Sequence, residues 1–308
     1  MNLPRLTLAV VLLSSLLSVA RAEDAYTQSV DAWRADRTAR LTKPDGWLSL
    51  IGLHWLQPGD NTVGRGPENK IQLSAGPDFF GTVNLGPGGV VTFKPNPSAY
   101  ALIDDQPAHA TELRYRDGTK PSVVRSGTVS FFVIERGDRR VDLPKSAQMA
   151  TALRVRDTES PRRKNFPGLD WFAVDPAWRI EATWVPFAEP RETKITNVLG
   201  QLLVVKVPGK AVFTHDGHTY ELLPIDEGPG EPLFFVFTDA TAGDETYESS
   251  RFLYADAPKD GKVILDFNEA QNPPCAFTPF ATCPLPPKEN RLPFKVLAGE
   301  KKFKGEHR

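Results

Sequence analysis

The chain has 308 residues, a formal net charge of −1 at pH 7, 40% apolar residues and 24% charged residues. A chain of this length suggests about two domains and can bury a sizeable core. The balance of apolar and charged residues argues against intrinsic disorder, and the near-zero net charge argues against nucleic acid as a partner. The 23 glycines and 28 prolines favour many turns between short strands over long helices.

The first 22 residues have the three parts of a secretory signal. A positive charge near the start precedes an apolar run, Leu6–Val19, and an Ala-Arg-Ala motif ending at Ala22 has the small residues of a cleavage site. The apolar run is shorter than the roughly 20 residues that span a bilayer. We expect cleavage before Glu23, no stable membrane span in the mature protein, and a periplasmic or secreted location.

Residues 23–46 contain one predicted helix. Tyr26, Trp33 and Leu41 recur at near-helical spacing among charged residues, which is typical of an amphipathic helix. The Pro-Asp-Gly sequence at 44–46 ends this pattern.

After the helix, short apolar runs separated by glycine and proline indicate almost only strands. We expect a first β module at 47–155, a hinge at 156–179 and a second β module at 180–308. The strands expected for the second module are Arg179–Pro186, Gln201–Val207, Ala211–Thr214, Thr219–Leu223, Leu233–Phe237, Arg251–Ala255 and Lys262–Phe267.

The segment NTVGRGPENKIQLS, residues 61–74, resembles the opening of forkhead-associated domains. In those domains an arginine and a Ser-x-x-His sequence serve phosphothreonine recognition. Here Ser74 is followed by Ala-Gly-Pro, so the histidine is missing and the resemblance implies the fold without the activity. The expected fold is mainly β, with an N-terminal helix, a forkhead-associated-like β-sandwich and a second small antiparallel β-barrel or sandwich.

The proline-rich stretch Asp266–Pro293 contains both cysteines of the chain, Cys275 and Cys283. Proline excludes a helix or a central strand, while the interleaved aromatic residues indicate an ordered loop. In an exported protein two cysteines are expected to form a disulfide, with a free nucleophilic thiol as the alternative. A zinc site is not expected, because the cysteine spacing does not match a knuckle and no histidine lies nearby.

The hinge is rich in arginine, which suits either a site for a carboxylate or phosphate or a solvated linker with local ion pairs. Beyond it, no common hydrolase, metalloprotease or nucleotide-binding motif is present, and no metal or cofactor is expected. His215 and His218 flank a hairpin turn and are interpreted as solvent-exposed, because two ligands without a third do not make a metal site.

The mature chain resembles the bacterial DUF1684 family, whose function is unknown, from the first helix to Lys301. The segments GDETYESSRFLYAD and LDFNEAQNPPCAFTPFATCPLPPKENRLP carry much of this likeness. The resemblance supplies no activity. The residues typical of its motifs are Arg156, Asp157, Ser160, Phe166, Trp171, Arg251, Tyr254, Asp256, Asn268, Asn272, Cys275, Cys283, Glu289 and Asn290.

The leading hypothesis is a periplasmic protein that binds a small, anionic molecule between the modules or at the mouth of the second one. The alternatives are a hydrolase or isomerase that uses carboxylates, and a cell-envelope module that binds another protein. The candidate ligand-binding residues are Arg156, Arg162, Arg163, Trp171, Arg251, Tyr254, Asn268, Asn272, Phe277 and Asn290. The candidate catalytic carboxylates are Asp256, Asp266 and Glu289. One cavity shared by Arg162, Arg251, Asn272 and Glu289 is a direct expectation of this hypothesis.

Overall fold

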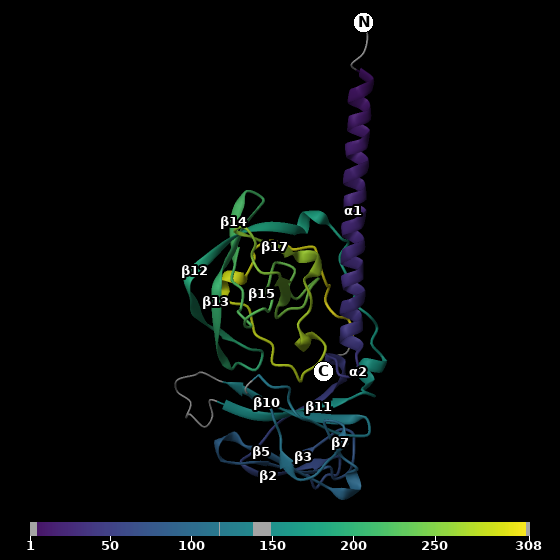
Figure 1. Ribbon diagram of the computed structural model, residues 1–308, viewed down its shortest axis with the longest axis vertical. Helices are drawn as coiled ribbons and strands as arrows, with labels where there is room; N and C mark the ends of the chain where they lie inside the picture. The colour runs from purple at the N-terminus through teal and green to yellow at the C-terminus, as the bar shows by residue number, and fades with distance from the viewer. Residues whose placement is uncertain (1–4, 117, 138–148, 306–308) are drawn as a thin grey trace.

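The computed structural model describes residues 5–116, 118–137 and 149–305. One long helix, α1 (Arg5–Thr42), stands beside two β-rich regions that follow it in the chain (Figure 1). The expectation of a mainly β fold with an N-terminal helix is confirmed. Helix α1 begins well before residue 23, so the segment interpreted as a signal is helical from Arg5, and its cleavage stays a prediction. In the described residues, no helix combines the length and apolarity needed to cross a membrane.

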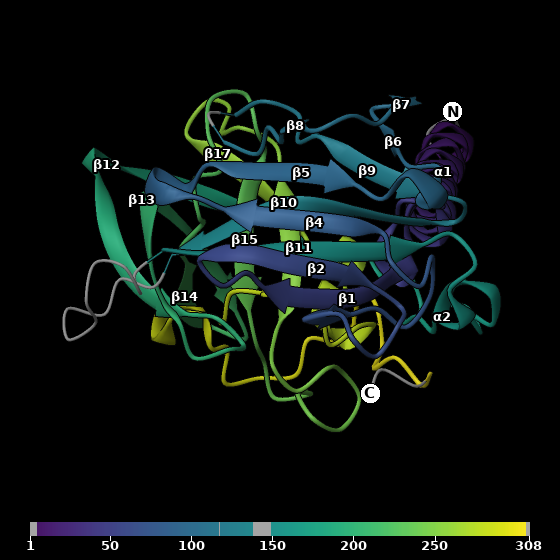
Figure 2. The same ribbon diagram turned by 90° about the horizontal axis from the view of Figure 1, so that it is seen from below.

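The first β region is built from two stacked sheets (Figure 2). In spatial order the six-stranded sheet contains β1 (Leu50–Trp55), β11 (Met149–Asp157), β10 (Val129–Gly137), β9 (Val123–Ser126), β6 (Leu102–Ile103) and β7 (Gln106–Pro107). The five-stranded sheet contains β3 (Ile71–Gln72), β2 (Gly59–Gly64), β4 (Gly81–Leu85), β5 (Val91–Pro95) and β8 (Thr111–Glu112). Phe80, Phe93 and Phe131 meet edge to face between the sheets, with ring centroids 5.3–6.3 Å apart. Such aromatic contacts fix the spacing of the two sheets.

The second β region is a curved four-stranded sheet with a two-stranded sheet inside its curve (Figure 1). The curved sheet has the order β14 (His218–Leu222), β13 (Leu202–His215), β12 (Arg179–Thr196) and β17 (Lys262–Asp266). The small sheet pairs β15 (Leu233–Phe237) with β16 (Arg251–Ala255). Buried side chains between them include Phe213, Phe235, Phe237 and Phe267.

Two expected strand boundaries in this region are wrong. The separate strands expected at Gln201–Val207 and Ala211–Thr214 are one strand, β13, and β12 continues ten residues past its expected end at Pro186. The register shifts between Pro186 and Arg191, where Pro186 faces Gly209. Proline and glycine were interpreted as breaks, but the paired strands accommodate them as a bulge.

Short helices occupy the connections. They are η1 (Trp47–Ser49), η2 (Pro87–Gly89), η3 (Pro97–Ala99), α2 (Pro161–Lys164), η5 (Pro176–Trp178), η6 (Phe267–Glu269), η7 (Pro274–Ala276) and η8 (Lys288–Asn290). Three of them, η6 to η8, lie in the proline-rich loop, which packs Phe277 and both cysteines against Leu41 and Leu48. The loop is therefore ordered, as its aromatic residues indicate.

The outer face of the six-stranded sheet lies toward the second β region (Figure 1). On β11, Leu153 and Val155 face the sandwich core, so the alternating residues Arg154 and Arg156 face away from it. Arg136 on β10 lies on the same outer side, and its Nε donates to Thr282 of the proline-rich loop at 2.8 Å. Arginine side chains thus line the boundary between the two β regions.

Helix α1 is docked by a buried ion pair. The Nε of Arg37 donates to Glu300 at 2.7 Å and its Nη2 donates to the carbonyl of Asn272 at 2.9 Å. The second carboxylate oxygen of Glu300 accepts from the backbone N–H of Asn272 at 2.8 Å. These bonds fix the C-terminal half of α1 against Asn272 of the proline-rich loop and against Glu300, and so position its side chains over the boundary.

Candidate functional site

Four expected ligand-binding residues are fully buried and held by contacts within the protein. Arg251 pairs with Asp239 at 2.5 Å and donates to the carbonyl of Ala298 at 2.6 Å. The amide of Asn290 bonds the backbone of Leu223 and Val236. These side chains hold strands and loops together, so they do not face a ligand.

Asn268 and Phe277 are also buried and held by contacts within the protein. The Asn268 amide accepts from the backbone N–H of Asp175 and donates to its carbonyl, at 3.0 and 2.9 Å. Phe277 packs edge-on against Phe303, with ring centroids 4.9 Å apart. Both residues are completely buried, so they hold the fold together and do not face a ligand.

The remaining expected residues lie in different places. Arg163 donates to the carbonyls of Thr42 and Thr158, and Trp171 packs against Trp33 of α1. Arg162 lies at a separate cavity of about 930 Å³, with its guanidinium 5.6 Å from the centre of the Phe280 ring. Glu289 is exposed. The expectation that Arg162, Arg251, Asn272 and Glu289 share one cavity is wrong, because their side chains face different parts of the fold.

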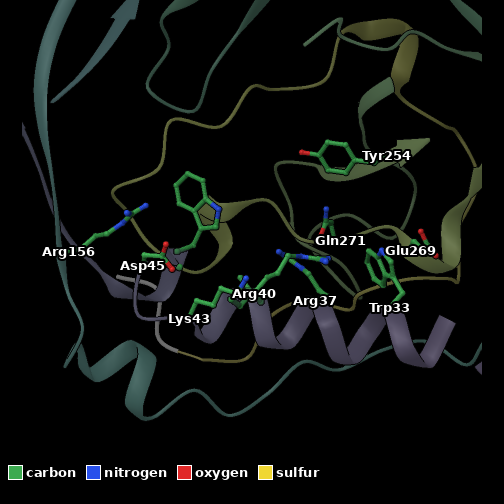
Figure 3. Close-up of a pocket in the computed structure, with 12 residues that line it drawn as sticks. Trp33, Arg37, Arg40, Lys43, Asp45, Arg156, Tyr254, Glu269 and Gln271 are labelled. Atoms are coloured by element: carbon green, nitrogen blue, oxygen red, sulfur yellow. The ribbon is translucent and has the colours of Figure 1, made fainter. Parts of the chain in front are cut away.

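A cavity of about 600 Å³ lies where the end of α1 meets both β regions (Figure 3). Helix α1 and the turn after it supply Trp33, Arg37, Arg40, Lys43, Asp45 and Trp47; the β regions supply Arg156, Tyr254, Glu269 and Gln271. In the close-up, Arg156 and Asp45 lie at one end and Glu269 lies at the other. The cavity thus has charged ends and aromatic walls.

A smaller cavity of about 320 Å³ continues from the first. Arg37, Trp47, Tyr254 and Gln271 line both, and the smaller one adds Arg136, Glu227, Asn272 and Cys283 among its walls. The hydroxyphenyl ring of Tyr254 stacks on Phe234 with centroids 4.9 Å apart. Together the two cavities have the size and the mixed lining of a small-molecule site.

Several buried polar atoms around these cavities have no hydrogen-bond partner in the protein. They are Nε and Nη2 of Arg154, Nε of Arg156, Oε1 of Gln271 and Oδ1 of Asn272. Buried polar groups are nearly always paired, and leaving one unpaired costs about 1–3 kcal/mol. Arg156, Gln271 and Asn272 line the cavities, whereas Arg154 lines neither and lies 5.3 Å from the ring centre of Trp47, which lines both. These atoms indicate a place where water or a ligand completes the bonding.

Two arginines at this site, Arg154 and Arg156, differ from Arg37 and Arg40, which pair with Glu300 and Asp36. Arg154 is only 6% exposed, its guanidinium lies 5.3 Å from the centre of the Trp47 ring, and within the described part of the chain neither it nor Arg156 forms an ion pair with a carboxylate. Burial, with repulsion from Arg136 and Arg156, lowers the pKa of Arg154 to about 10. The side chain is therefore still charged at neutral pH, and its charge favours an anion nearby.

A third, more open cavity of about 1380 Å³ adjoins the first, because Tyr254 and Glu269 line both. Two of the three expected catalytic carboxylates, Asp256 and Asp266, lie on its walls. Asp266 accepts from the hydroxyl of Tyr26 at 2.8 Å through either oxygen.

Known proteins give this site a family but no activity. The model of the DUF1684 family, described as "Protein of unknown function", matches residues 164–301. This region belongs to the DUF1684 family. A solution NMR structure of an uncharacterized protein from Haloarcula marismortui is 30% identical, with a TM-score of 0.40 over 47% of this chain and 81% of that one. No curated protein matches.

The cavities are not formed by the DUF1684 region alone. Tyr254, Glu269 and Gln271 belong to it, whereas Arg37 comes from α1 and Arg156 from β11, both before residue 164. Among the sequence-derived candidates, Arg156, Tyr254 and Asn272 line these cavities. The helix residues and Gln271 were missed, because their periodicity and composition indicate only an amphipathic helix and a loop.

Glu269, a carboxylate of the DUF1684 region, was also missed. It lies at the junction of two cavities, and within the described residues no donor or cation is bonded to it. Burial, together with the nearby charges of Asp266 and Asp256, raises the pKa of Glu269 to about 7. A carboxyl group with this pKa exchanges protons near neutral pH, as general acids and bases do.

Glu269 should make stability depend on pH. Its pKa is higher in the folded protein than the usual 4.5, so the fold favours the neutral form. Its contribution to stability therefore falls as pH rises from about 4.5 to about 7 and stays constant above that. We expect Glu269→Gln to be more stable than the wild type by about 1–2 kcal/mol above pH 7, after allowing for solvent screening, and by much less at pH 5.

Urea unfolding at several pH values measures this difference. Glu289→Gln, at an exposed position outside these cavities, is the control and should follow the wild-type profile. A constant offset between Glu269→Gln and the wild type across this range would contradict the assignment.

The two histidines that flank the hairpin turn differ in exposure. His218 is exposed as expected, but His215 is half-buried between Phe294 and Trp178, with ring centroids 4.2 and 5.1 Å away, so its expected exposure is wrong. The described residues contain no group of three or more side chains suited to a metal ion.

Cys275 and Cys283 are buried free thiols, and the backbone N–H of Cys275 donates to the sulfur of Cys283 at 3.3 Å. Their oxidation to a disulfide stays a prediction.

Proposed function

We propose that this protein is an exported binding protein for a small anionic molecule, held in the two joined cavities at the end of α1. The observation that carries the proposal is the unpaired Nε and Nη2 of the buried Arg154, beside Arg156 and Arg136 without bonded carboxylates. A buried cation without a counter-ion is costly, and an incoming carboxylate or phosphate would remove that cost. The aromatic rings of Trp47 and Tyr254 would contact the rest of the molecule.

Export is the second part of the proposal and rests on the signal-like sequence before Glu23. In an oxidising compartment Cys275 and Cys283 would form a disulfide, closing a short ring in the proline-rich loop beside the smaller cavity. Non-reducing mass spectrometry of the protein from its native compartment, together with its N-terminal sequence, tests both points. An N-terminus at Met1 or two free thiols would count against them.

Anion binding is tested by calorimetry with phosphate, sulfate and a series of small carboxylates. We expect at least one to bind, and Arg156→Met to weaken that binding about tenfold or more. Arg125→Met is the matched control, because Arg125 pairs with Asp105 on an exposed part of the sandwich. Absence of binding by every anion at about 10 mM, or equal losses in both variants, would overturn the proposal.

Catalysis is a second candidate function, favoured specifically by Glu269. The carboxylates expected from the sequence do not support it equally: Glu289 is exposed away from the cavities, and Asp266 already bonds Tyr26. Glu269 has a pKa of about 7 and lies at the junction of two cavities, so it would be the proton-transferring group of a hydrolase or isomerase. Turnover that is lost in Glu269→Gln while anion binding persists would establish this function.

A further inference from the structure

The unpaired atoms around the cavities include acceptors as well as donors. Oδ1 of Asn272, in a residue only 1% exposed, and Oε1 of Gln271 have no partner. An acceptor needs an N–H or O–H group, and a carboxylate or sulfate group offers none. Arg156 Nε, by contrast, needs an acceptor. A ligand that completes the bonding must therefore carry both kinds of group.

The charges that line the cavities change from mainly basic at the end formed by α1 and β11 to mainly acidic in the third cavity. The end formed by α1 and β11 contains Arg37, Arg40, Lys43 and Arg156 with Asp45 as its acid. Beyond Tyr254 the third cavity is rich in acids: Glu23, Asp175, Glu181, Asp256, Asp260 and Asp266 line it with three basic residues. Glu269 lies where the two ends meet.

Most charged groups near Glu269 are already paired with others. Arg40 pairs with Asp36, and Asp266 bonds Tyr26 and lies 3.8 Å from Arg179. In the described residues, Asp256 and Glu269 have no hydrogen bond or ion pair. Their mutual repulsion is part of what raises the pKa of Glu269. A cation placed beside Glu269 would relieve that repulsion.

From these observations we infer that the ligand is a zwitterion, with its carboxylate at the arginine end and its ammonium group beside Glu269 and Asp256. Amino acids and short peptides have this chemistry. The inference rests on the proposed anion site and adds the requirement for a cation. In a short peptide, the N–H groups of the peptide bonds between the two ends would donate to the amide oxygens of Gln271 and Asn272. The aromatic rings of Trp33 and Tyr254 line the path and suit an ammonium group as well as a carbon chain.

The experiment compares matched probes in calorimetry with the full-length protein. The probes are ω-amino acids of about two to eight carbons, fatty acids of the same lengths, and the corresponding alkylamines. We expect at least one ω-amino acid to bind about tenfold more tightly than both its fatty acid and its amine. In Glu269→Gln the two acids should differ by about twofold at most, because the contact with the ammonium group is lost. Glu289→Gln, outside the cavities, should retain the tenfold difference.

The outcomes separate this inference from the site on which it rests. If fatty acids bind but the amino group adds nothing at any length, the zwitterion is excluded and the anion site stands. If neither fatty acids nor ω-amino acids bind, both proposals fail. A tenfold preference that persists in Glu269→Gln would overturn the placement of the ammonium group beside Glu269.

Discussion

Arg251→Met is expected to destabilise the protein by about 3–5 kcal/mol, more than any other single substitution proposed for this chain. Arg251 and Asp239 are each 1% exposed on their side chains and lie 2.5 Å apart, so removing the guanidinium leaves a buried carboxylate without its cation. Arg251 also donates to the carbonyls of Val296 and Ala298, which it connects to β16. Chemical unfolding at neutral pH measures the loss.

Two further variants separate the buried pair from ordinary surface charge. Lys295→Met removes a cation from an exposed pair with Glu245, and should leave stability nearly unchanged, because solvent screens this pair. The double variant Arg251→Met/Asp239→Leu should recover part of the loss, because no unpaired charge remains in the core. An Arg251→Met protein as stable as the Lys295→Met protein would show that the ion pair contributes little.

Arg251 also shows why residue type alone did not locate the site. From the sequence, the arginine of the strand RFLYA was interpreted as a polar group available to a ligand. Its partners Asp239, Val296 and Ala298 lie 12 to 47 residues away in the chain. Burial of an arginine depends on such distant partners, which no local pattern reveals. Asn268 and Asn290 were misinterpreted for the same reason: each replaces backbone hydrogen bonds of a distant segment.

The sequence predicted those elements whose structure depends mainly on neighbouring residues in the chain. The helix end after Leu41, the strands Leu233–Phe237 and Arg251–Ala255, and the ordered proline-rich loop follow from turn residues, apolar runs and aromatic content. Arg156 and Tyr254, both expected among the ligand-binding residues, line one cavity, and their role in binding stays a prediction. The other walls come from α1, and which face of a helix meets a cavity is determined only when the helix docks.

The docking of α1 and the turn after it leaves a buried positive charge without a carboxylate partner, and this charge is the basis for the proposed anion binding. Trp47, five residues after the end of α1, lies over the guanidinium of Arg154, and the turn before it lines the cavity together with Arg156. Burial therefore removes water from Arg154 without supplying a carboxylate. Such an arrangement lowers stability, and proteins tolerate it where function needs it.

Arg154→Met is accordingly expected to raise stability and to weaken anion binding in the same protein. Removing a buried charge with two unpaired N–H groups should add about 1–3 kcal/mol to the free energy of unfolding, since methionine fills similar space without that cost. Anion affinity should fall about tenfold, because a buried positive charge next to Trp47 and Arg156, which line the cavity, is lost. Chemical unfolding and calorimetry with the tightest-binding anion measure the two effects.

Arg163→Met is the matched control, because that guanidinium donates to the carbonyls of Thr42 and Thr158 at 2.7 and 2.8 Å. Its loss should lower stability by about 1–3 kcal/mol and leave anion affinity unchanged. The opposite signs of the two stability changes distinguish an arginine kept for binding from one kept for folding. If Arg154→Met were destabilised to the same degree as Arg163→Met, Arg154 would be part of the scaffold, and the anion site would lose the observation on which it rests.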